Sequence, residues 1–536
     1  MLRVHRLYST RGAAEVLHAA PKYALRCGLE IHTQLNTRNK LFSLSTNDPF
    51  QAAATPNYHT SFFDISLPGT QPRLNYEAVL YAIKLSLALD CRVNLKSQFD
   101  RKHYFYGDQP LGYQITQHYN PIAKDGKLCL YGAYDNIPED EKTIGIIQLQ
   151  LEQDTGRSLY KDTDGMTLID LNRSNVPLVE MVTQPDFTDV KQVRAFVKKY
   201  QNLVRHLNIS TGDLETGAMR VDVNMSVNGH ARVELKNLPN TSSITNAIRY
   251  EYQRQVDIIR SGQADKMLKD VETRGWTGSA TIKLRSKEST IDYRYMPDPE
   301  IPVLLLEPEV VHRVATALPE LPDQTLRKLM AEPYNLSLKD AKILTTNSNS
   351  HGNFYTHHDL RNYFMKTFQL FTAKTGASNS KLPANWIIHE LLGIINKLEI
   401  PLPKILQLLP ASHFAEFLAL IHDNELSKSS AKLLLFHIIN DFKESHCSNL
   451  ALPDFRLLIE QYNLNPLNEV EEHALTELCQ YVLRELNDDA LVADLVSGKK
   501  KNALKFLLGK GMRLSQGKVD PALLEGAFKS VLGIKW

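Results

Sequence analysis

Acidic side chains and a histidine alternate with apolar residues in several short segments of the chain. In Leu29–Leu35, Glu30, His32 and Gln34 occupy alternate positions. The same period of two surrounds further carboxylates, namely Glu152, Asp154, Asp222 and Glu234. Successive side chains of a β-strand point to opposite faces, so each segment predicts a strand with one apolar and one charged face.

The charged faces have two explanations. One solvated face of an antiparallel sheet also alternates with a buried one, without any function. Carboxylates are poor strand formers, however, and several of them on facing strands repel one another unless a cation lies among them. Magnesium takes oxygen ligands of this kind. We therefore favour a cleft lined by metal ligands over a face that is merely solvated.

Common nucleotide-binding and nucleophile motifs are absent from the sequence. It contains no GxxxxGK[ST] phosphate loop, no GxGxxG after a strand and no GxSxG elbow. The five cysteines are scattered and form no CxxC pair, which disfavours structural zinc and a disulfide framework. If the protein uses a nucleotide, magnesium held by carboxylates must organise its phosphates.

The composition sets the scale of the molecule that carries these residues. The 536 residues, 43% hydrophobic and 23% charged, are typical of soluble globular proteins with two to four domains. The 62 basic and 60 acidic residues nearly cancel, so any surface for nucleic acid must be local. No apolar stretch approaches the ~20 residues of a membrane span, and we predict none.

The periodicity divides the chain into a sheet-rich part and a helical part. Strand-like segments prevail from about residue 25 to 298, interrupted by helical stripes at Tyr76–Leu87, Val190–Leu207 and Ser242–Ile259. Helical periodicity prevails after Met296–Glu300. We predict an α+β chain with an antiparallel-sheet domain at 23–300, a helical domain at 301–380 and a further helical region at 381–536.

Both ends of the chain are basic. Arg3, Arg6 and Arg11 face a single acid, Glu15, which predicts a mitochondrial transit peptide at 1–22 and a location in the matrix. The alternative is a mildly basic terminus. The last forty residues hold nine basic and two acidic side chains, a net charge of +7. This glycine-broken tail either contacts phosphates or is a solvated lysine-rich end.

Five long stretches occur in order along the chain: Gly28–Thr37, Phe99–Tyr106, Thr167–Arg173, Arg232–Leu238 and Asp292–Pro299. Together they resemble the signature stretches of the GatB family, the B subunits of glutamyl-tRNA(Gln) amidotransferase. The resemblance extends from about residue 25 to the C-terminus. The transit-like start and the residues of these stretches resemble the fungal mitochondrial form.

The resemblance implies a fold and a reaction. The fold is a cradle domain with an antiparallel sheet like that of glutamine synthetase, then a helical domain and a YqeY-like all-α tail. The γ-carboxylate of Glu-tRNA(Gln) is phosphorylated with ATP and Mg²⁺, and ammonia displaces the phosphate to give Gln-tRNA(Gln) for mitochondrial translation. This is a carbon–nitrogen ligation with glutamine as nitrogen donor. The amidase partner, GatA, supplies the ammonia, and a small partner, GatF, completes the fungal complex.

The resemblance also implies roles for single residues. Metal-binding and catalytic roles fall on Glu30, His32, Glu152, Glu180 and Glu234. Taken alone, a strand histidine is more often a satisfied polar side chain, and Glu180 could be the buried partner of an arginine. Their occurrence together in matched motifs favours ligands.

Basic residues complete the implied site. For the phosphates of ATP or of the glutamyl phosphate, the candidates are Arg173, Arg220, Lys236 and Arg285. Arginine on a polar sheet face usually makes structural ion pairs, which is the alternative. For the tRNA, the candidates are Arg101, Lys102 and His103 at the acceptor end and Lys499, Lys500, Lys501 and Lys505 in the tail.

The chain departs from the family pattern at several positions. Gln150 and Gln153 stand where the family often has a histidine and a second glutamate, Gly107 stands where proline is frequent, and Glu215 is a single acid where two are usual. Glutamine offers Mg²⁺ an oxygen but no negative charge. These changes motivate an alternative function, a non-catalytic tRNA-binding scaffold. A free-standing ligase related to glutamine synthetase is disfavoured by the basic tail.

Overall fold

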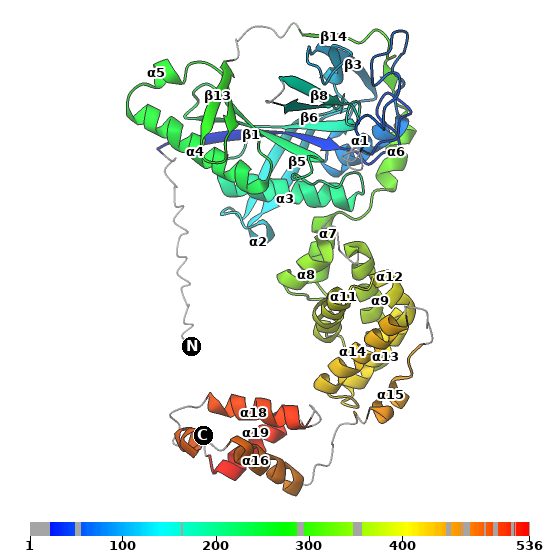
Figure 1. Cartoon of the computed structure of the whole chain (residues 1–536), viewed down its shortest axis with the longest axis vertical. Helices are drawn as coiled ribbons and strands as arrows, with labels where there is room; N and C mark the ends of the chain where they lie inside the picture. Colours follow the sequence, from blue (N-terminus) through cyan, green and yellow to red (C-terminus); the bar gives the residue numbers. More distant parts are fainter. Residues whose placement is uncertain are drawn as a thin grey trace, which may run out of the picture. The chain divides into compact units, whose positions relative to one another are not determined.

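The computed structural model describes residues 22–48, 55–161, 165–286, 294–346, 356–445, 452–462, 464, 472–486, 489–496, 502–515, 519 and 521–534. Two compact units, Met1–Pro319 and Glu320–Trp536, make up the chain (Figure 1). The first contains a large sheet with helices, and the described part of the second is helical, which confirms the predicted α+β order. The predicted transit peptide, except for Lys22, lies outside the described residues, as do Lys499, Lys500 and Lys501.

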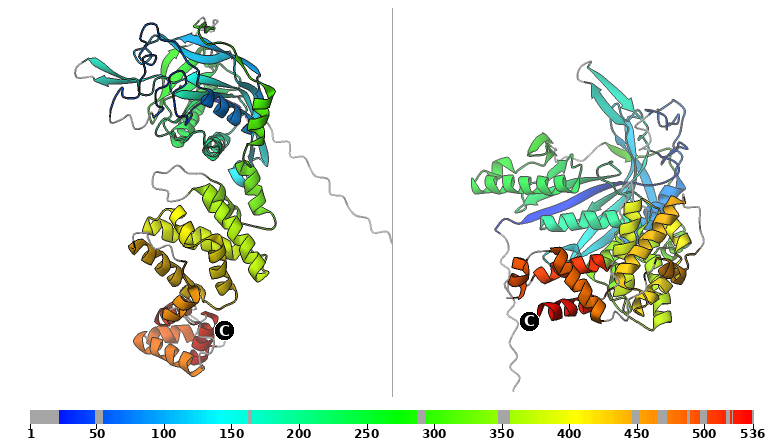
Figure 2. Two further views of the ribbon diagram at one scale, coloured as in Figure 1. Left: turned by 90° about the vertical axis from the view of Figure 1, so that its right-hand side faces the viewer. Right: turned by 60° about the horizontal axis from the view of Figure 1, so that its bottom comes forward.

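The first unit is built on a 13-stranded sheet with β1 (Leu25–Gln34) near its middle. The strand order is β13-β12-β11-β10-β1-β9-β6-β4-β3-β14, while β15 pairs with β3, β2 with β5 and β5 with β6. The bounds are β2 (Arg92–Val93), β3 (Lys96–His103), β4 (Tyr113–Asn120), β5 (Ala123–Tyr131), β6 (Glu141–Gln153), β9 (Pro177–Thr183), β10 (Met219–Val227), β11 (Val233–Lys236), β12 (Glu272–Trp276), β13 (Thr281–Ser286), β14 (Tyr295–Pro297) and β15 (Leu304–Leu305). A separate hairpin, β7 (Arg157–Lys161) and β8 (Met166–Asp170), projects from it (Figure 2).

The strand directions correct one expectation. Neighbouring strands run antiparallel throughout this sheet except for β11 and β12, which are parallel. Helix α4 (Thr241–Arg260) lies between these two strands in the chain, and such a crossover returns the backbone in the same direction. The sheet is therefore mixed at this one pair and antiparallel elsewhere.

Helices cover the apolar face of the sheet. On β1, Cys27, Leu29 and Ile31 are at most 1% exposed. Helix α1 (Tyr76–Ala88) contacts β5 and β6, α3 (Val190–His206) contacts β5, and α4 contacts β10. The three predicted helices are confirmed, and each side chain on their apolar stripes contributes about 1.5–3 kcal/mol when fully buried. Shorter helices of this unit are α2 (Gly132–Asp135), α5 (Ala264–Met267) and α6 (Pro308–Thr316).

A local signal sets the start of α3. The Asp189 carboxylate accepts a hydrogen bond from the Lys191 amide, and the Gln192 side chain accepts one from the Asp189 amide. This reciprocal cap satisfies amides that the first helical turn leaves unpaired. The helix is thereby fixed across the apolar face, where Tyr200 shares a 2.9 Å hydrogen bond with Thr33 of β1.

The second unit is helical in its described part. Its elements are α7 (Pro322–Met330), α8 (Leu338–Thr345), α9 (His357–Thr375), α10 (Lys381–Ala384), the π-helix η2 (Asn385–Leu391), α11 (Leu392–Leu398), α12 (Leu402–Leu408), α13 (Ala411–His422), α14 (Lys428–Glu444), α15 (Phe455–Gln461), α16 (Glu472–Leu486), α17 (Asp489–Val496), α18 (Ala503–Leu514) and α19 (Pro521–Leu532). Trp386 is 3% exposed and packs edge-on against Phe417, as predicted for a core residue. Within the described ranges no single helix could cross a membrane; α12 and α13, bent by 71°, meet the length and composition criteria only as a pair.

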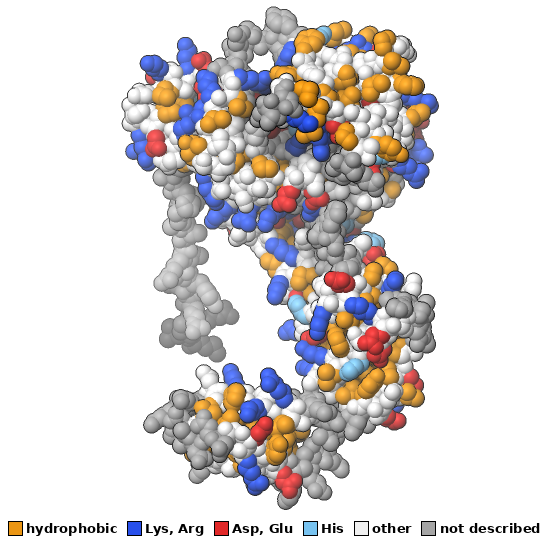
Figure 3. Space-filling view, viewed as in Figure 1, with side chains coloured by type: hydrophobic (Ala, Val, Ile, Leu, Met, Phe, Trp, Pro, Cys, Tyr) orange, Lys and Arg blue, Asp and Glu red, His pale blue; other side chains and the backbone are white. Residues whose placement is uncertain are grey.

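The tail helices have a core of their own. Leu504 and Leu507 of α18 pack with Leu524 and Phe528 of α19. A Cβ on Gly511 would lie 2.9 Å from a Leu524 methyl, so the absent side chain permits this close packing. Lys and Arg side chains lie over these helices in Figure 3, and Lys505 is exposed.

Candidate active site

The face of the sheet opposite α1, α3 and α4 carries the predicted acidic residues. Strand β1 lies between β9 and β10, and its register places His32 opposite Glu180 on one side and Arg220 on the other. Glu30 is opposite Asp222 of β10. Because paired residues of antiparallel strands point to the same face, these side chains converge.

A first cluster consists of His32, Glu152 and Glu180, one ligand atom of each lying within 4.8 Å of the others. His32 Nε2 is 3.8 Å from Glu152 Oε1 and 3.8 Å from Glu180 Oε2. The side-chain amide of Gln114 donates to Glu152 at 2.7 Å, and that of Gln150 donates to Glu180 at 2.6 Å. The three groups are thus held by neighbouring strands in a geometry that a small cation can enter.

Burial and mutual repulsion perturb the titration of the first cluster. Burial, reinforced by the charges of Arg220 and Lys236, lowers the pKa of His32 to about 3, so its ring is neutral and free to ligate. Burial also raises the pKa of Glu152. For Glu180, burial and the charges of Glu152 and Glu30 raise the pKa well above its usual range. A divalent cation would stabilise the ionised form of both carboxylates.

A second cluster consists of Glu30, Asp222 and Glu234, again with ligand atoms within 4.8 Å. Asn224 donates to Glu30 at 2.7 Å, and the Thr273 hydroxyl donates to Glu234 at 2.7 Å. The donor set of the two clusters, five carboxylates and one imidazole, fits the oxygen-rich coordination of Mg²⁺.

All five predicted ligands fall into these two clusters, and the structure adds a sixth candidate. Asp222 belongs to the alternating segment 220–226, but the implied ligand set omitted it. Its position opposite Glu30 is the signal that identifies it. The coordination itself stays a prediction.

The two glutamines that depart from the family pattern serve other groups. Gln150 donates to Glu180 and, at 3.2 Å, to Thr116. Gln153 is fully buried, and its side-chain oxygen accepts a hydrogen bond from the Ile115 amide. Neither glutamine takes a ligand away from the six clustered side chains.

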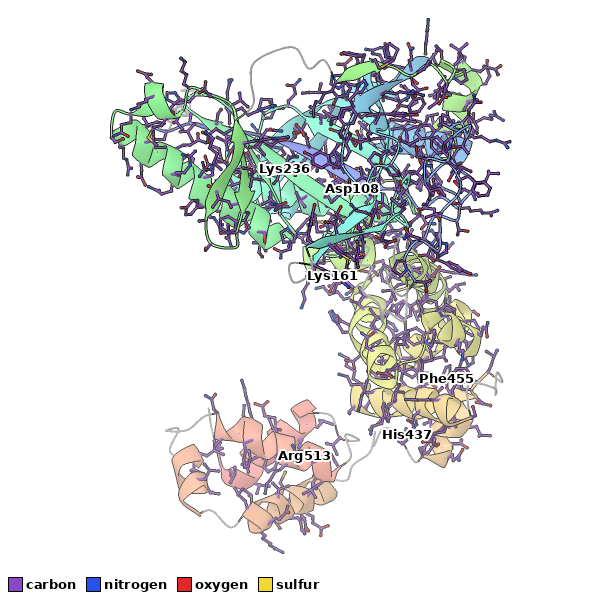
Figure 4. All side chains as sticks on the ribbon, turned by 45° about the horizontal axis from the view of Figure 1, so that its top comes forward. Asp108, Lys161, Lys236, His437, Phe455 and Arg513 are labelled. Carbon is purple, nitrogen blue, oxygen red and sulfur yellow. The ribbon has the colours of Figure 1, made fainter. Side chains whose placement is uncertain are left out.

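Three of the four predicted phosphate-binding residues make ion pairs, one of them with carboxylates of the second cluster. Lys236 Nζ lies 2.7 Å from Asp222 and 3.4 Å from Glu234, and Figure 4 labels it on the sheet. Burial lowers the pKa of Lys236, but Asp222 and Glu234 outweigh it and raise the pKa, so the ammonium stays charged. Arg220 and Arg173 both approach a further carboxylate instead.

That carboxylate belongs to Asp154, which follows β6 directly. Arg220 Nη2 lies 2.9 Å from Asp154 Oδ1, and Arg173 Nε lies 3.7 Å from the same atom. Burial alone would raise the pKa of Asp154, but the charges of Arg220 and Arg173 lower it. Arg285, on β13, is exposed and has no ion pair among the described residues.

The three residues predicted to lie at the acceptor end of the tRNA have different surroundings in the structure. The Arg101 guanidinium donates at 2.7 Å to both Asp298 and Glu300, so its charge is balanced within the fold. His103 Nδ1 lies 2.9 Å from the Arg294 carbonyl. Lys102 faces the first cluster: burial lowers its pKa, and the charges of Glu152, Tyr295 and Glu180 outweigh burial and raise it. Their roles toward tRNA stay predictions.

A cavity of about 350 Å³ adjoins the second cluster at Glu30. Gly28 is one of its lining residues, and Ile147, Val182 and Pro185 are among the apolar ones. Arg26 and Arg232 line it as well; both are exposed, and neither has an ion pair among the described residues. The sequence alone had assigned no function to these two arginines.

Comparison with known proteins gives matches over most of the chain. A family described as the GatB/GatE catalytic domain matches residues 25–312, and one described as the GatB domain matches residues 369–532. Proteins named as the mitochondrial B subunit of glutamyl-tRNA(Gln) amidotransferase are similar throughout. The one from Vanderwaltozyma polyspora is 59% identical over 537 residues, 100% of both chains. Those from Zygosaccharomyces rouxii and Saccharomyces cerevisiae S288c are 60% and 59% identical, covering 96% and 100% of both chains.

Proposed function

The chain belongs to the family of mitochondrial B subunits of glutamyl-tRNA(Gln) amidotransferase, and on that premise we propose that its sheet phosphorylates the γ-carboxylate of Glu-tRNA(Gln) with ATP and Mg²⁺. Ammonia then displaces the phosphate to give Gln-tRNA(Gln). The observation that carries this proposal is the pair of clusters on one sheet face. We also propose that the sheet domain is a cradle like that of glutamine synthetase and that the protein works in the mitochondrial matrix.

The clusters and the cations around them have complementary tasks. Magnesium bound by the six clustered side chains would neutralise phosphate oxygens and act as a Lewis acid. Lys236 at the second cluster and Arg220 between the clusters supply positive charge for the phosphoryl group, which gains negative charge in transit. Lys102 faces the first cluster and can hold the glutamyl carboxylate or its phosphate.

The cavity beside Glu30 suits the rest of the nucleotide. Its apolar residues can pack against a base and ribose, while Arg26 and Arg232 can pair with phosphates. Gly28 also lines this cavity, and a Cβ there would be in tight contact with backbone, 3.3 Å from the Gln184 carbonyl oxygen. We place the γ-phosphate at the second cluster, because Glu30 belongs to both the cavity and that cluster.

Partners supply what this sequence lacks. The chain carries no glutaminase signature, so we propose that an amidase of the GatA type delivers ammonia and that a small GatF protein completes the complex. We also propose that Lys505, with Lys499, Lys500 and Lys501, contacts the tRNA body. Each lysine that meets a phosphate should steepen the logarithmic salt dependence of binding by about one unit.

The scaffold alternative rested on Gln150 and Gln153. Gln150 orients Glu180 and Gln153 serves a backbone amide, so both substitutions leave the six clustered side chains in place. We therefore favour catalysis over a purely tRNA-holding role.

The test is phosphate release by the assembled complex, with ATP, Mg²⁺, Glu-tRNA(Gln) and ammonium chloride in place of glutamine. Glu30→Gln should abolish phosphate release and Gln-tRNA(Gln) formation while tRNA affinity stays nearly unchanged. The control is Glu141→Gln, which alters an exposed carboxylate on β6 outside both clusters. Undiminished turnover in Glu30→Gln would move the chemistry elsewhere and favour the scaffold.

A further inference from the structure

Asp154 is a buried carboxylate at the reaction face that belongs to neither cluster. Its side chain is 3% exposed. Oδ1 accepts hydrogen bonds from Arg220 at 2.9 Å and from the Thr155 amide at 2.9 Å, and Oδ2 accepts one from Gln34 at 3.0 Å. With both oxygens engaged by these donors, Asp154 has a fixed orientation.

Arg220 lies between the two clusters. On β10 it is opposite His32 of the first cluster and two residues from Asp222 of the second. Its guanidinium side chain is 34% exposed, and its charge interacts with both Glu152 and Asp222. Without another acceptor, such a cation would pair with those ligand carboxylates and compete with the ions they bind.

Arg173 supports the same arrangement and lies 3.7 Å from the same Asp154 oxygen. Its Nε and Nη2 donate to the carbonyls of Thr155 and Gly156 at 2.9 and 2.7 Å, directly after Asp154 in the chain. Two guanidinium groups thus converge on one carboxylate, and the backbone that carries this carboxylate is itself held.

We propose that Asp154 is a positioning residue that holds the Arg220 guanidinium between the first and second clusters, away from their carboxylates and directed at the phosphoryl group in transit. This rests on the proposed function. In that step a glutamyl carboxylate oxygen bonds to the γ-phosphorus, the bond from this phosphorus to the β–γ bridging oxygen breaks, and ADP leaves with the electron pair. A cation fixed in advance stabilises the charge without reorganising during the step.

The experiment compares Asp154→Asn with wild type in the assembled complex. The readouts are kcat and KM for ATP, and the Kd, per active site, of ADP with aluminium fluoride and Mg²⁺, which mimics the transferring phosphoryl group. We expect kcat to fall roughly 100-fold and the affinity for the mimic to weaken by a similar factor. KM for ATP should change less than about threefold, because the ground state does not need Arg220 in this position.

Glu251→Gln is the matched control. Glu251 is likewise a buried carboxylate between two arginines, 2.6 Å from Arg254 and 3.4 Å from Arg274, but it lies on α4 outside the clusters. This variant reports the structural cost of removing such a charge and should leave the Kd of the mimic per active site unchanged. Unchanged affinity for the mimic in Asp154→Asn, or an equal loss of ATP affinity, would overturn the proposal.

A double-mutant cycle tests whether Asp154 acts through Arg220. Adding Asp154→Asn to Arg220→Ala should cost little further activity, whereas an additive loss would refute the assignment. If Asp154→Asn does not fold, Arg220→Lys replaces it and should lower kcat while leaving KM for ATP nearly unchanged. Wild-type affinity of Arg220→Lys for the mimic would refute the proposal. A wild-type complex that fails to turn over ATP overturns the proposed function; an active wild type with an indifferent Asp154→Asn overturns this inference alone.

Discussion

The two clusters share one sheet face but differ in how their negative charge is balanced. In the second cluster, Lys236 pairs with Asp222 and Glu234 at 2.7 and 3.4 Å. In the first, no lysine or arginine nitrogen of the described residues lies within 4.0 Å of the Glu152 or Glu180 carboxylates. Among the described residues, the one basic side chain within 4.0 Å of these carboxylates is His32, at 3.8 Å, and its ring is neutral.

From this difference we infer that the two clusters would bind their metal ions under different conditions. Lys102 acts on Glu152 and Glu180 through its charge but forms no ion pair with them. Two buried carboxylates without such a pair need a proton or a metal ion to be stable. Carboxylates that already pair with an ammonium lose that partner only when phosphates attract it away. We therefore expect the first cluster to hold its ion without nucleotide and the second to bind its ion together with ATP.

Among the changes that distinguish the two clusters, we expect the largest effect from Glu152→Gln, which breaks the first cluster. Loss of a charged ligand should lower phosphate release about 10³-fold, since a metal ion supplies several kcal/mol of charge stabilisation. Binding of Mn²⁺ without nucleotide, followed by electron paramagnetic resonance, should disappear. Asp222→Asn should keep that Mn²⁺ site; its loss there would contradict the proposed order of filling.

Lys236→Met tests the balance in the second cluster. We expect phosphate release to fall about 100-fold, because a phosphate-binding cation is lost. Nucleotide-free metal binding at this cluster should tighten about tenfold, worth 1.4 kcal/mol, because the competing ammonium is gone. Calorimetric titration with Mg²⁺ measures this. Lys283→Met, which removes a half-exposed partner of Glu272, should alter neither quantity.

A smaller effect should separate the groups that support each cluster. Gln150→Met removes the donor to Glu180 and should raise the Mg²⁺ concentration for half-maximal phosphate release about tenfold. Thr273→Val removes the hydrogen-bond donor to Glu234, but Glu234 still has its ion pair with Lys236. This variant should therefore raise the Mg²⁺ concentration for half-maximal phosphate release only about two- to threefold. The reverse order would show that the lysine does not substitute for such a donor.

The smallest effect concerns the pH dependence of stability without metal. Because the pKa of Glu180 is raised above its usual 4.5, the folded state favours its protonated form, and that stability is lost as pH rises through the raised pKa. His32, with its pKa lowered from 6.5, opposes this only below about pH 6.5. Above pH 4.5, Glu180 therefore contributes to the free energy of unfolding a decline of at most about 1.4 kcal/mol per pH unit, which urea unfolding in EDTA measures. Glu180→Gln should flatten this decline, and an unchanged slope would contradict the assignment.

The sequence predicted which residues of the sheet carry the charged face. Alternation around Glu30, His32 and Glu234 predicted strands with charged faces, and all five predicted ligands occur in the two clusters. Asp222 also lies on such a face, but the family resemblance implies no metal-binding role for it. Its partner Glu30 lies 192 residues earlier in the chain, and only the pairing of β1 with β10 brings them together.

The ion-pair partners of the basic residues could not be predicted from the sequence. Arg101 and Arg220 have the same side chain and similar strand settings, yet one is balanced by Asp298, 197 residues away, and the other is held by Asp154 between the clusters. No local pattern distinguishes a paired arginine from an available one. The apolar-lined cavity with Arg26 and Arg232 was equally invisible, since strands distant in sequence form its walls.

The sequence by itself determined which side chains share a face of each strand, where the main helices run and to which family the chain is similar. These properties depend on backbone geometry within a few residues, and on motifs that persist as residue order. The tertiary structure alone decided which carboxylates meet, which cation pairs with them and which arginine lies between the two clusters. Those outcomes depend on strand order and register, which bring together residues that are 14, 66 or more than a hundred positions apart.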